Sequence, residues 1–132
     1  LAYGADGFGF TDVLYLDYTG GVDLSDSFFL GINAAYANSS DADGGYQGVA
    51  LYLQNEFSET FSLGLRPEMF IASSGSDDAT VSAFTLTGNL SLTDTLKIIS
   101  EFRYDTSDDM IIPGFPTDKN MSGASIAAVY SF

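Results

Sequence analysis

Residues 95–105, TLKIISEFRYD, contain the pattern that decides the fold class. Apolar and polar side chains alternate along this stretch, so the two kinds fall on opposite sides of an extended chain. One side holds Leu96, Ile98, Phe102 and Tyr104, and the other holds Lys97, Glu101, Arg103 and Asp105. A period of two predicts a β-strand with one apolar and one charged face.

The same alternation recurs along the rest of the chain, at residues 14–24, 28–36, 49–57, 61–71, 84–92 and 123–132. These segments predict about seven strands. The length of each strand is close to the ~9–11 residues of a tilted membrane strand and exceeds the ~5–6 residues of an average soluble strand. Helices fit poorly, because Gly and β-branched residues are dispersed through every segment. We therefore predict an all-β fold, an antiparallel up-and-down transmembrane β-barrel of about 7–8 strands that forms a single domain over residues 1–132.

Two kinds of connection separate the predicted strands. Three are short and nearly identical, at residues 24–28 (LSDSF), 57–61 (FSETF) and 92–96 (LTDTL), so a hairpin unit repeats along the chain. A three-residue loop keeps the flanking apolar residues on one face, and its Ser and Thr oxygens can accept bonds from turn amides. The other connections, at residues 38–45, 73–80 and 106–120, are expected to be long, acidic loops on the external side, opposite short periplasmic turns.

The composition excludes several classes of function. The chain carries 18 acidic and 4 basic residues, which argues against nucleic acid as a partner. It has no Cys and no His, so disulfides, thiolate metal sites and the commonest catalytic base are absent. No Ser-acid pair stands out as a catalytic site either, so we do not expect an enzyme or a bound cofactor. The chain begins at Leu1 without a basic and apolar leader, which predicts a mature or trimmed chain.

A barrel in lipid needs apolar residues outside and polar residues inside. We therefore expect five charged side chains to line the lumen: Arg66, Glu68, Lys97, Glu101 and Arg103. The hairpin register predicts that Thr87 faces Glu101, that Thr85 faces Arg103, and that Tyr52 faces Arg66. These charges could line a hydrated pore, or they could pair and fill a narrow barrel as a polar core, which ~8 strands would favour. Pro67 removes a ladder hydrogen bond, so a bulge or sheet edge is expected there.

Three segments resemble a known family: GYQGVALYLQNEFSETFSLGLRPEMF at 45–70, LTGNLSLTDTLKIISEFRYD at 86–105, and the closing AAVYSF. Their shared phrase, a strand, a short hydroxyl-acid turn and then Phe-Ser-Leu-Gly-Leu-Arg, resembles the OmpL-like β-barrel porin family. The resemblance covers most of the chain and implies a porin-like outer-membrane protein of a Gram-negative bacterium, embedded in outer-membrane lipid.

The last segment also resembles the C-terminal signal that the barrel-assembly machinery reads. Ser125, Tyr130 and Phe132 match that signal, whereas Ala127 stands where Gly is usual. The resemblance implies that this machinery is a partner during biogenesis. A strand at any sheet edge could also end in Phe, but the terminal carboxylate directly after Phe132 favours the signal.

The predicted long loops are rich in acids: Asp41, Asp43, Asp77, Asp78, Asp108 and Asp109. Carboxylates suit Ca²⁺ or Mg²⁺, but residues 41–44 supply only the start of a calcium loop, so a solvated acidic surface is the expectation and no metal site is predicted. The last loop also holds an apolar run at 110–116, which is expected to pack on the rim or in the mouth of the barrel rather than on a partner.

The predicted strand count is odd, whereas single-chain bacterial barrels have an even number. Residues 1–7 could add a partial strand, several chains could close the wall, or the chain could be the C-terminal part of a larger barrel, which we favour. Two functions remain open: passive diffusion of small solutes or ions through a pore, and a non-conducting barrel that anchors envelope partners. A soluble ligand-carrying barrel would reverse the two faces. It is disfavoured by the long strands and the C-terminal signal.

Overall fold

The structure is a computed structural model that describes residues 2–4, 12–40, 44–107 and 119–132. Its secondary structure is one sheet, whose strands are β1 (Ala2–Gly4), β2 (Val13–Ser25), β3 (Phe28–Ser39), β4 (Gly44–Ser58), β5 (Phe61–Ser74), β6 (Asp77–Thr93), β7 (Leu96–Ser107) and β8 (Asn120–Tyr130). Among these residues, no helix is long and apolar enough to cross a membrane.

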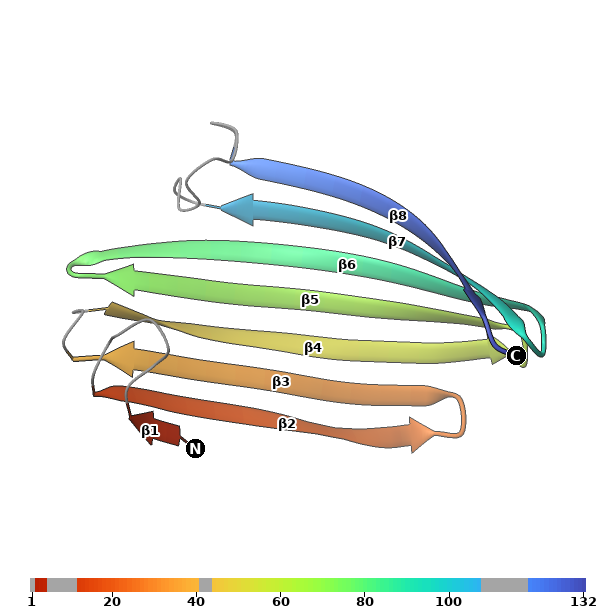
Figure 1. The fold of residues 1–132 in the computed structure, drawn as a ribbon, viewed down its shortest axis with the longest axis horizontal. Coiled ribbons are helices and arrows are strands. Elements are labelled where there is room, and N and C mark those ends of the chain that lie inside the picture. Colours follow the sequence, from red (N-terminus) through yellow and green to blue (C-terminus); the bar gives the residue numbers. More distant parts are fainter. Residues whose placement is uncertain (1, 5–11, 41–43, 108–118) are drawn as a thin grey trace.

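Each strand pairs antiparallel with the next one along the chain, in the order β1-β2-β3-β4-β5-β6-β7-β8 (Figure 1). This up-and-down order confirms the predicted all-β architecture. Seven of the strands have 11 to 17 residues, so they are long enough to cross a bilayer at a tilt. The three-residue β1 pairs with Val13–Tyr15 of β2 and supplies the partial strand that was one of the three expectations.

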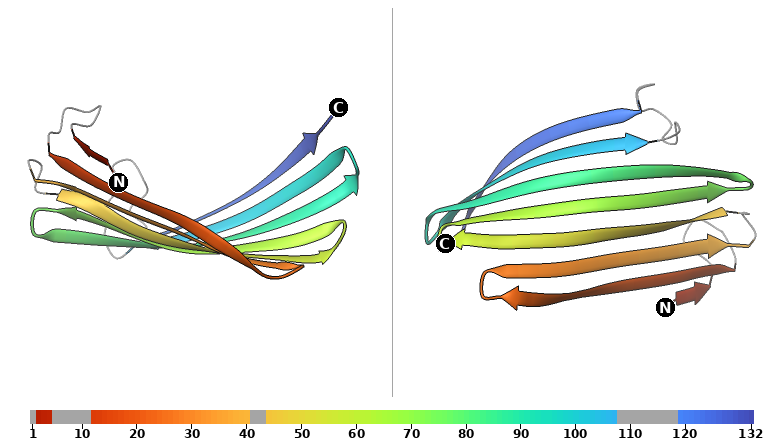
Figure 2. Two further views of the ribbon diagram at one scale, coloured as in Figure 1. Left: turned by 90° about the horizontal axis from the view of Figure 1, so that it is seen from below. Right: turned by 180° about the vertical axis from the view of Figure 1, so that it is seen from behind.

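The sheet is bent but not closed into a barrel. Figure 2 shows the strands curving together, with β1 and β8 at opposite edges. Within the ranges that the structure describes, β1 pairs only with β2, and β8 pairs only with β7. The chain thus forms a curved wall, as expected for part of a barrel.

The three short turns are nearly identical in structure as well as in sequence. In each, a two-residue turn follows a bulge: Ser25 pairs with Phe28, Ser58 with Phe61, and Thr93 with Leu96. Because of the bulge, three residues still separate the two apolar residues that flank each turn, as the sequence predicted. These apolar residues therefore stay on one face.

The first hydroxyl of each turn accepts backbone hydrogen bonds, as predicted. Ser58 Oγ accepts bonds from the amides of Thr60, at 3.3 Å, and Phe61, at 3.1 Å. Thr93 Oγ1 accepts equivalent bonds from Thr95 and Leu96. No residue of these turns has a positive φ, because the hydroxyl oxygens satisfy the amides without glycine.

Two of the connections that were predicted to be long external loops are shorter than predicted. β5 and β6 are joined by the two residues Gly75 and Ser76, so the prediction of a long loop at 73–80 is wrong. Gly75 has a φ of 64°, at the first turn position, where a two-residue hairpin of type II′ requires glycine. The strands also continue to Ser39 and begin again at Gly44, which leaves residues 40–43 as the connection instead of 38–45.

Pro67 lies inside β5 without a bulge, so the expectation of a bulge or edge there is also wrong. Pro67 pairs with Phe84 on β6. Toward β4, the ladder breaks between Ala50↔Glu68 and Leu53↔Leu65 and then resumes in the same register. Proline lacks the N–H that would have bonded to β4, so one bond is lost while the pairing on either side keeps the strands aligned.

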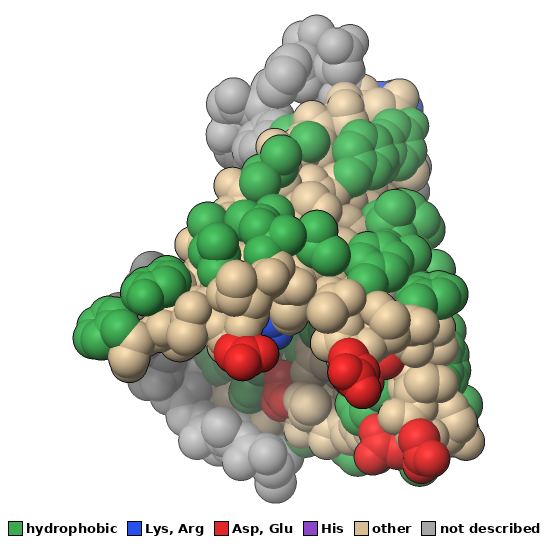
Figure 3. All heavy atoms as spheres, turned by 90° about the vertical axis from the view of Figure 1, so that its right-hand side faces the viewer, with side chains coloured by type: hydrophobic (Ala, Val, Ile, Leu, Met, Phe, Trp, Pro, Cys, Tyr) green, Lys and Arg blue, Asp and Glu red, His purple; other side chains and the backbone are tan. Residues whose placement is uncertain are grey.

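Two faces of the sheet differ sharply in composition. The side that carries Arg66, Thr85 and Arg103 is called the polar face. These three residues are in register across β5, β6 and β7. The apolar face is the other side, marked by the register row of Leu65, Leu86 and Phe102. In Figure 3, seen from the end with the short turns, charged side chains gather between the two flanks, and hydrophobic side chains cover the right-hand flank.

The polar face is the crowded side of the bent sheet. All the buried described residues lie on it, namely Gly31, Ala37, Ser39, Ala50, Ala83 and Thr85. Most of the exposed large hydrophobic side chains lie on the apolar face instead, including Leu51, Leu86, Phe102 and Ile126. Side chains on the inside of a curved sheet shield one another, whereas those outside splay apart, so the burial identifies the polar face as the concave side.

Candidate functional site: the charged polar face

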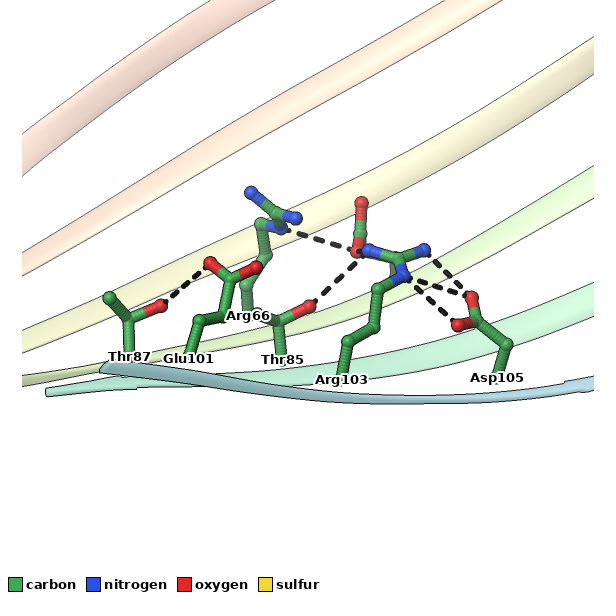
Figure 4. Close-up of polar contacts among 7 residues, drawn as sticks. Arg66, Thr85, Thr87, Glu101, Arg103 and Asp105 are labelled. Carbon is green, nitrogen blue, oxygen red and sulfur yellow. Dashed lines mark hydrogen bonds and ion pairs between the residues drawn. The ribbon is translucent and has the colours of Figure 1, made fainter. Parts of the chain in front are cut away.

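Arg103 is the most fully bonded side chain of the polar face (Figure 4). Its Nη2 and Nε donate to the carboxylate of Asp105, at 2.8 and 3.0 Å to Oδ1, and its Nη1 donates to Glu68 Oε2 at 2.5 Å. Nη1 also lies 3.3 Å from Thr85 Oγ1. Since Glu68 is on β5, Thr85 on β6 and Arg103 on β7, this one guanidinium connects three strands. A planar fork with several donors is suited to such multiple bonding.

Thr85 lies beneath this network and is only 1% exposed. Its small β-branched side chain fits the crowded face between Arg66 and Arg103, and its hydroxyl finds a partner in Arg103. A buried hydroxyl without a partner would destabilise the sheet, so Thr85 is suited to the position on both counts.

Arg66 is held more loosely than Arg103. Its Nε lies 3.2 Å from Glu68 Oε2, without the alignment of a hydrogen bond. Its Cζ lies 5.9 Å from the centroid of the Tyr52 ring, within cation–π range. In the part of the chain that the structure describes, the two terminal nitrogens of Arg66 form no hydrogen bond or ion pair, as Figure 4 shows. Arg66 therefore keeps most of its donors available.

The remaining predicted residues lie on the same face but outside the ion-pair cluster. Glu101 accepts a hydrogen bond from Thr87 Oγ1 at 3.2 Å. Lys97 is exposed and pairs with no acid among the described side chains. All five predicted charged residues thus share one face, and the structure brings Arg66, Glu68 and Arg103 together. The predicted neighbours Thr85–Arg103 and Thr87–Glu101 are in register.

The predicted set omitted Asp105 and Thr85, which complete the network around Arg103. The signal for Asp105 was present, since the alternation of residues 95–105 already placed it on the charged face. For Thr85 the hairpin register predicted the place opposite Arg103, but not the burial, because the burial arises from two arginines on neighbouring strands.

The residues of the assembly signal lie near the free edge of the sheet. Ser125 is on the polar face opposite Glu101, and Tyr130 is on the apolar face and 64% exposed. Phe132 is fully exposed, while the amide of its neighbour Ser131 donates to Thr95 O at 2.9 Å. Recognition by the assembly machinery stays a prediction.

The predicted acidic loops fall mainly outside the described residues, which exclude 41–43 and 108–118 and so also the apolar run at 110–116. Asp78 is exposed and lies within β6 rather than in a loop. Among the described side chains, no group of three acids is placed to hold a metal ion.

A small hollow opens on the polar face at the end with the short turns. It has a volume of about 280 Å³ and is lined by residues that include Asp23, Phe29, Tyr52, Glu56, Gly64 and Arg66. It lies beside the Arg103 network and shares Arg66 with it, and Thr87, which bonds Glu101, also lines it. The free end of Arg66 therefore borders open space.

Comparison with known proteins agrees with this architecture. No curated protein and no solved structure matches the chain. A family description, "Putative beta-barrel porin-2, OmpL-like", matches residues 3–132, which is nearly the whole chain. This match fits the up-and-down sheet with one apolar and one charged face, and it bears out the resemblance drawn from the repeated turn and strand motifs. The chain belongs to this family of OmpL-like β-barrel porins and is part of a membrane-embedded barrel.

Proposed function

We propose that the protein forms a porin-like channel that lets small solutes or ions diffuse passively across the outer membrane of a Gram-negative bacterium. One observation carries this proposal: the charged side chains of the described strands lie on the polar face, apart from Asp78 near the start of β6. A wall with lipid on one side and water on the other needs this segregation. A protein that only packed against soluble partners would not need to keep its charged side chains on one face of the sheet.

The open sheet bears on how the channel is built. Unpaired backbone groups at a sheet edge cost several kcal/mol each in lipid, so β1 and β8 need partners in the membrane. We propose that further strands complete the wall, from the same polypeptide or from other copies of the chain. In a wide barrel the Arg103 network coats the wall, whereas in a barrel of ~8 strands it would fill the interior.

A non-conducting barrel that anchors envelope partners is the second candidate. It is favoured by the number of bonds that Arg103 makes, because a polar network that joins three strands is also what a filled barrel interior needs. The two candidates predict different conductance.

The remaining features of the proposal follow from the family and the sequence. We propose that the barrel-assembly machinery inserts the protein through Ser125, Tyr130 and Phe132, and that outer-membrane lipid surrounds the apolar face. Association into homo-oligomers or with other envelope proteins would use the same face. The absence of His and Cys supports a protein without enzymatic activity or cofactor.

Purified protein in planar bilayers tests the proposal. We expect stepwise single-channel currents, and heat-modifiable migration on gels as the control for a folded barrel. Reversal of Arg103 in R103E should change the ion selectivity of those currents, while Lys97→Glu serves as a comparison outside the network. A folded, heat-modifiable protein without current would favour the anchoring barrel, and unchanged selectivity in R103E would remove Arg103 from the conduction path.

A further inference from the structure

We infer that the hollow beside Arg66 binds small zwitterionic solutes, which carry a carboxylate at one end and an ammonium group at the other. The inference deepens the proposed channel function, on which it rests for its physiological meaning. It follows from the arrangement of opposite charges, of aromatic rings and of a single glycine around the hollow.

Arg66 supplies the positive end of the hollow. Arg103 uses all of its nitrogens to bond Asp105, Glu68 and Thr85, so it has little left to offer a solute. Arg66, by contrast, is held through Nε and its cation–π contact with Tyr52, and among the described residues its two terminal nitrogens form no hydrogen bond or ion pair. Two parallel terminal N–H donors match the two oxygens of a carboxylate.

Acids supply the other end. Asp23 on β2 and Glu56 on β4 line the hollow, and neither forms an ion pair with a base in the described ranges. Glu56 is in register with Ser62, four residues from Arg66 along the neighbouring strand. The two positions are therefore separated by about 13 Å of backbone, and both residues line the same hollow. An ammonium group fits this end and a simple anion does not.

Aromatic rings and glycines shape the space between. The Phe29 ring lies across Gly21 and Gly31, where any added Cβ would collide with it, so these glycines let the ring lie against the sheet. On the other side Tyr52 packs under Arg66. Gly64 forms the floor, and a Cβ there would meet no atom closer than 3.8 Å. The walls thus suit an apolar body between two charged ends.

The volume fits this class of solute. At about 280 Å³ the hollow is slightly smaller than the roughly 300–1,000 Å³ of typical small-molecule sites, so it suits a small solute. Free amino acids and short peptides share the required chemistry and differ in the distance between their charges.

Titration calorimetry on the purified protein in detergent tests the inference without requiring conductance. The probes are phenylalanine and the dipeptide Phe-Gly, with phenethylamine as the cation-only analogue and 3-phenylpropionate as the anion-only analogue. We expect one of the zwitterions to bind about tenfold more tightly than either analogue, since each lost charge-assisted contact removes that much affinity. The zwitterion that binds with the higher affinity shows whether the preferred solute is an amino acid or a peptide.

Variants locate the binding. Arg66→Gln should lose this preference, and Lys97→Gln, which removes a base from the same face outside the hollow, should keep it. Gly64→Val fills the floor without changing charge and should abolish binding. Its matched control is Gly123→Val, on the polar face of β8 and outside the hollow, where an added Cβ meets no atom within 4 Å. Gly64→Val also keeps the inference testable if Arg66→Gln does not fold.

Equal binding of all four probes, no binding, or unchanged binding in both Arg66→Gln and Gly64→Val would overturn the inference. Current recordings separate it from the proposed function. A protein that conducts but does not bind zwitterions keeps the channel and loses the subsite. One that binds them without conducting keeps the subsite and loses the channel.

Discussion

Arg103 of β7 and Glu68 of β5 are joined across β6, with Arg103 Nη1 2.5 Å from Glu68 Oε2. The two residues are 35 positions apart in the sequence. Between them lies Thr85, whose buried hydroxyl contacts the same nitrogen. The pair therefore ties three strands together on the polar face, and Glu68 is its central acceptor because Arg66 also contacts the same oxygen.

Replacing this acceptor should weaken the sheet. We expect Glu68→Gln to lower the free energy of unfolding by about 1–3 kcal/mol, because two arginines lose their shared carboxylate. Urea unfolding in detergent micelles measures the change. Glu101→Gln is the control, since Glu101 contacts only Thr87 among the described partners and should cost less. A coupling energy near zero in a Glu68/Arg103 double-mutant cycle would contradict the assigned link.

Removing a turn hydroxyl should destabilise its hairpin. Ser58→Ala takes away the acceptor for the amides of Thr60 and Phe61, and we expect a loss of about 0.5–1.5 kcal/mol. The same unfolding assay applies. Glu59 lies in the same turn without a hydrogen bond to the described residues, so Glu59→Ala should have little effect. Equal losses in both variants would show that the hydroxyl has no special role.

The left-handed turn at Gly75 should resist any side chain. We expect Gly75→Ala to cost about 1–2 kcal/mol, because its φ of 64° is unfavourable for a residue with a Cβ. Its surroundings add nothing to this cost, as no atom lies within 4 Å of the added carbon. Gly123→Ala has the same open surroundings without a positive φ, so it should be neutral or stabilising. Similar thermal midpoints for the two variants would argue against a backbone origin.

A charge on the apolar face should disrupt membrane insertion. Leu86 and Asn89 both lie on β6, on opposite faces. We expect Leu86→Arg to destabilise the inserted protein by about 2–4 kcal/mol, as for arginine facing lipid near the bilayer midplane. Asn89→Arg should be tolerated. Folding yield into lipid vesicles is the measurement, and the reverse order of tolerance would mean that the faces are assigned the wrong way round.

Truncating the last side chain should affect assembly more than stability. Phe132 is fully exposed, so Phe132→Ala removes no packing and should leave the unfolding midpoint unchanged. We expect a several-fold lower amount of protein in the outer membrane, because the predicted signal is lost. Ile126→Ala, at a residue 80% exposed on the same strand, provides the control for a change in surface hydrophobicity. Normal membrane levels of Phe132→Ala would argue against the signal.

Much of the fold follows from local pattern. The alternation in 95–105 predicted β7 and placed Lys97, Glu101 and Arg103 on one face, because side chains of an extended chain alternate whatever lies beside it. The repeated hydroxyl-acid turns predicted which strands are neighbours, since a tight turn leaves no other pairing. The structure and the family match bear out both predictions.

Two predictions were wrong because they relied on the local preference of a single residue. Gly75 was taken as part of a long loop, although its positive φ makes a two-residue turn between strands that continue on either side. Pro67 was expected to distort β5, but pairing with β6 and with the rest of β4 holds the strand in register. In both cases the many bonds of the sheet outweighed one residue's preference.

The face that each charge occupies could thus be derived from the sequence, because it depends only on the period of the strand. The sequence alone could not show which charged residues contact one another. Glu68 and Arg103 come together only when β5, β6 and β7 align and the sheet bends. The same holds for the contrast between a fully bonded Arg103 and an Arg66 whose terminal nitrogens find no partner among the described residues beside the hollow. Such contacts arise from register and curvature, which no single strand contains.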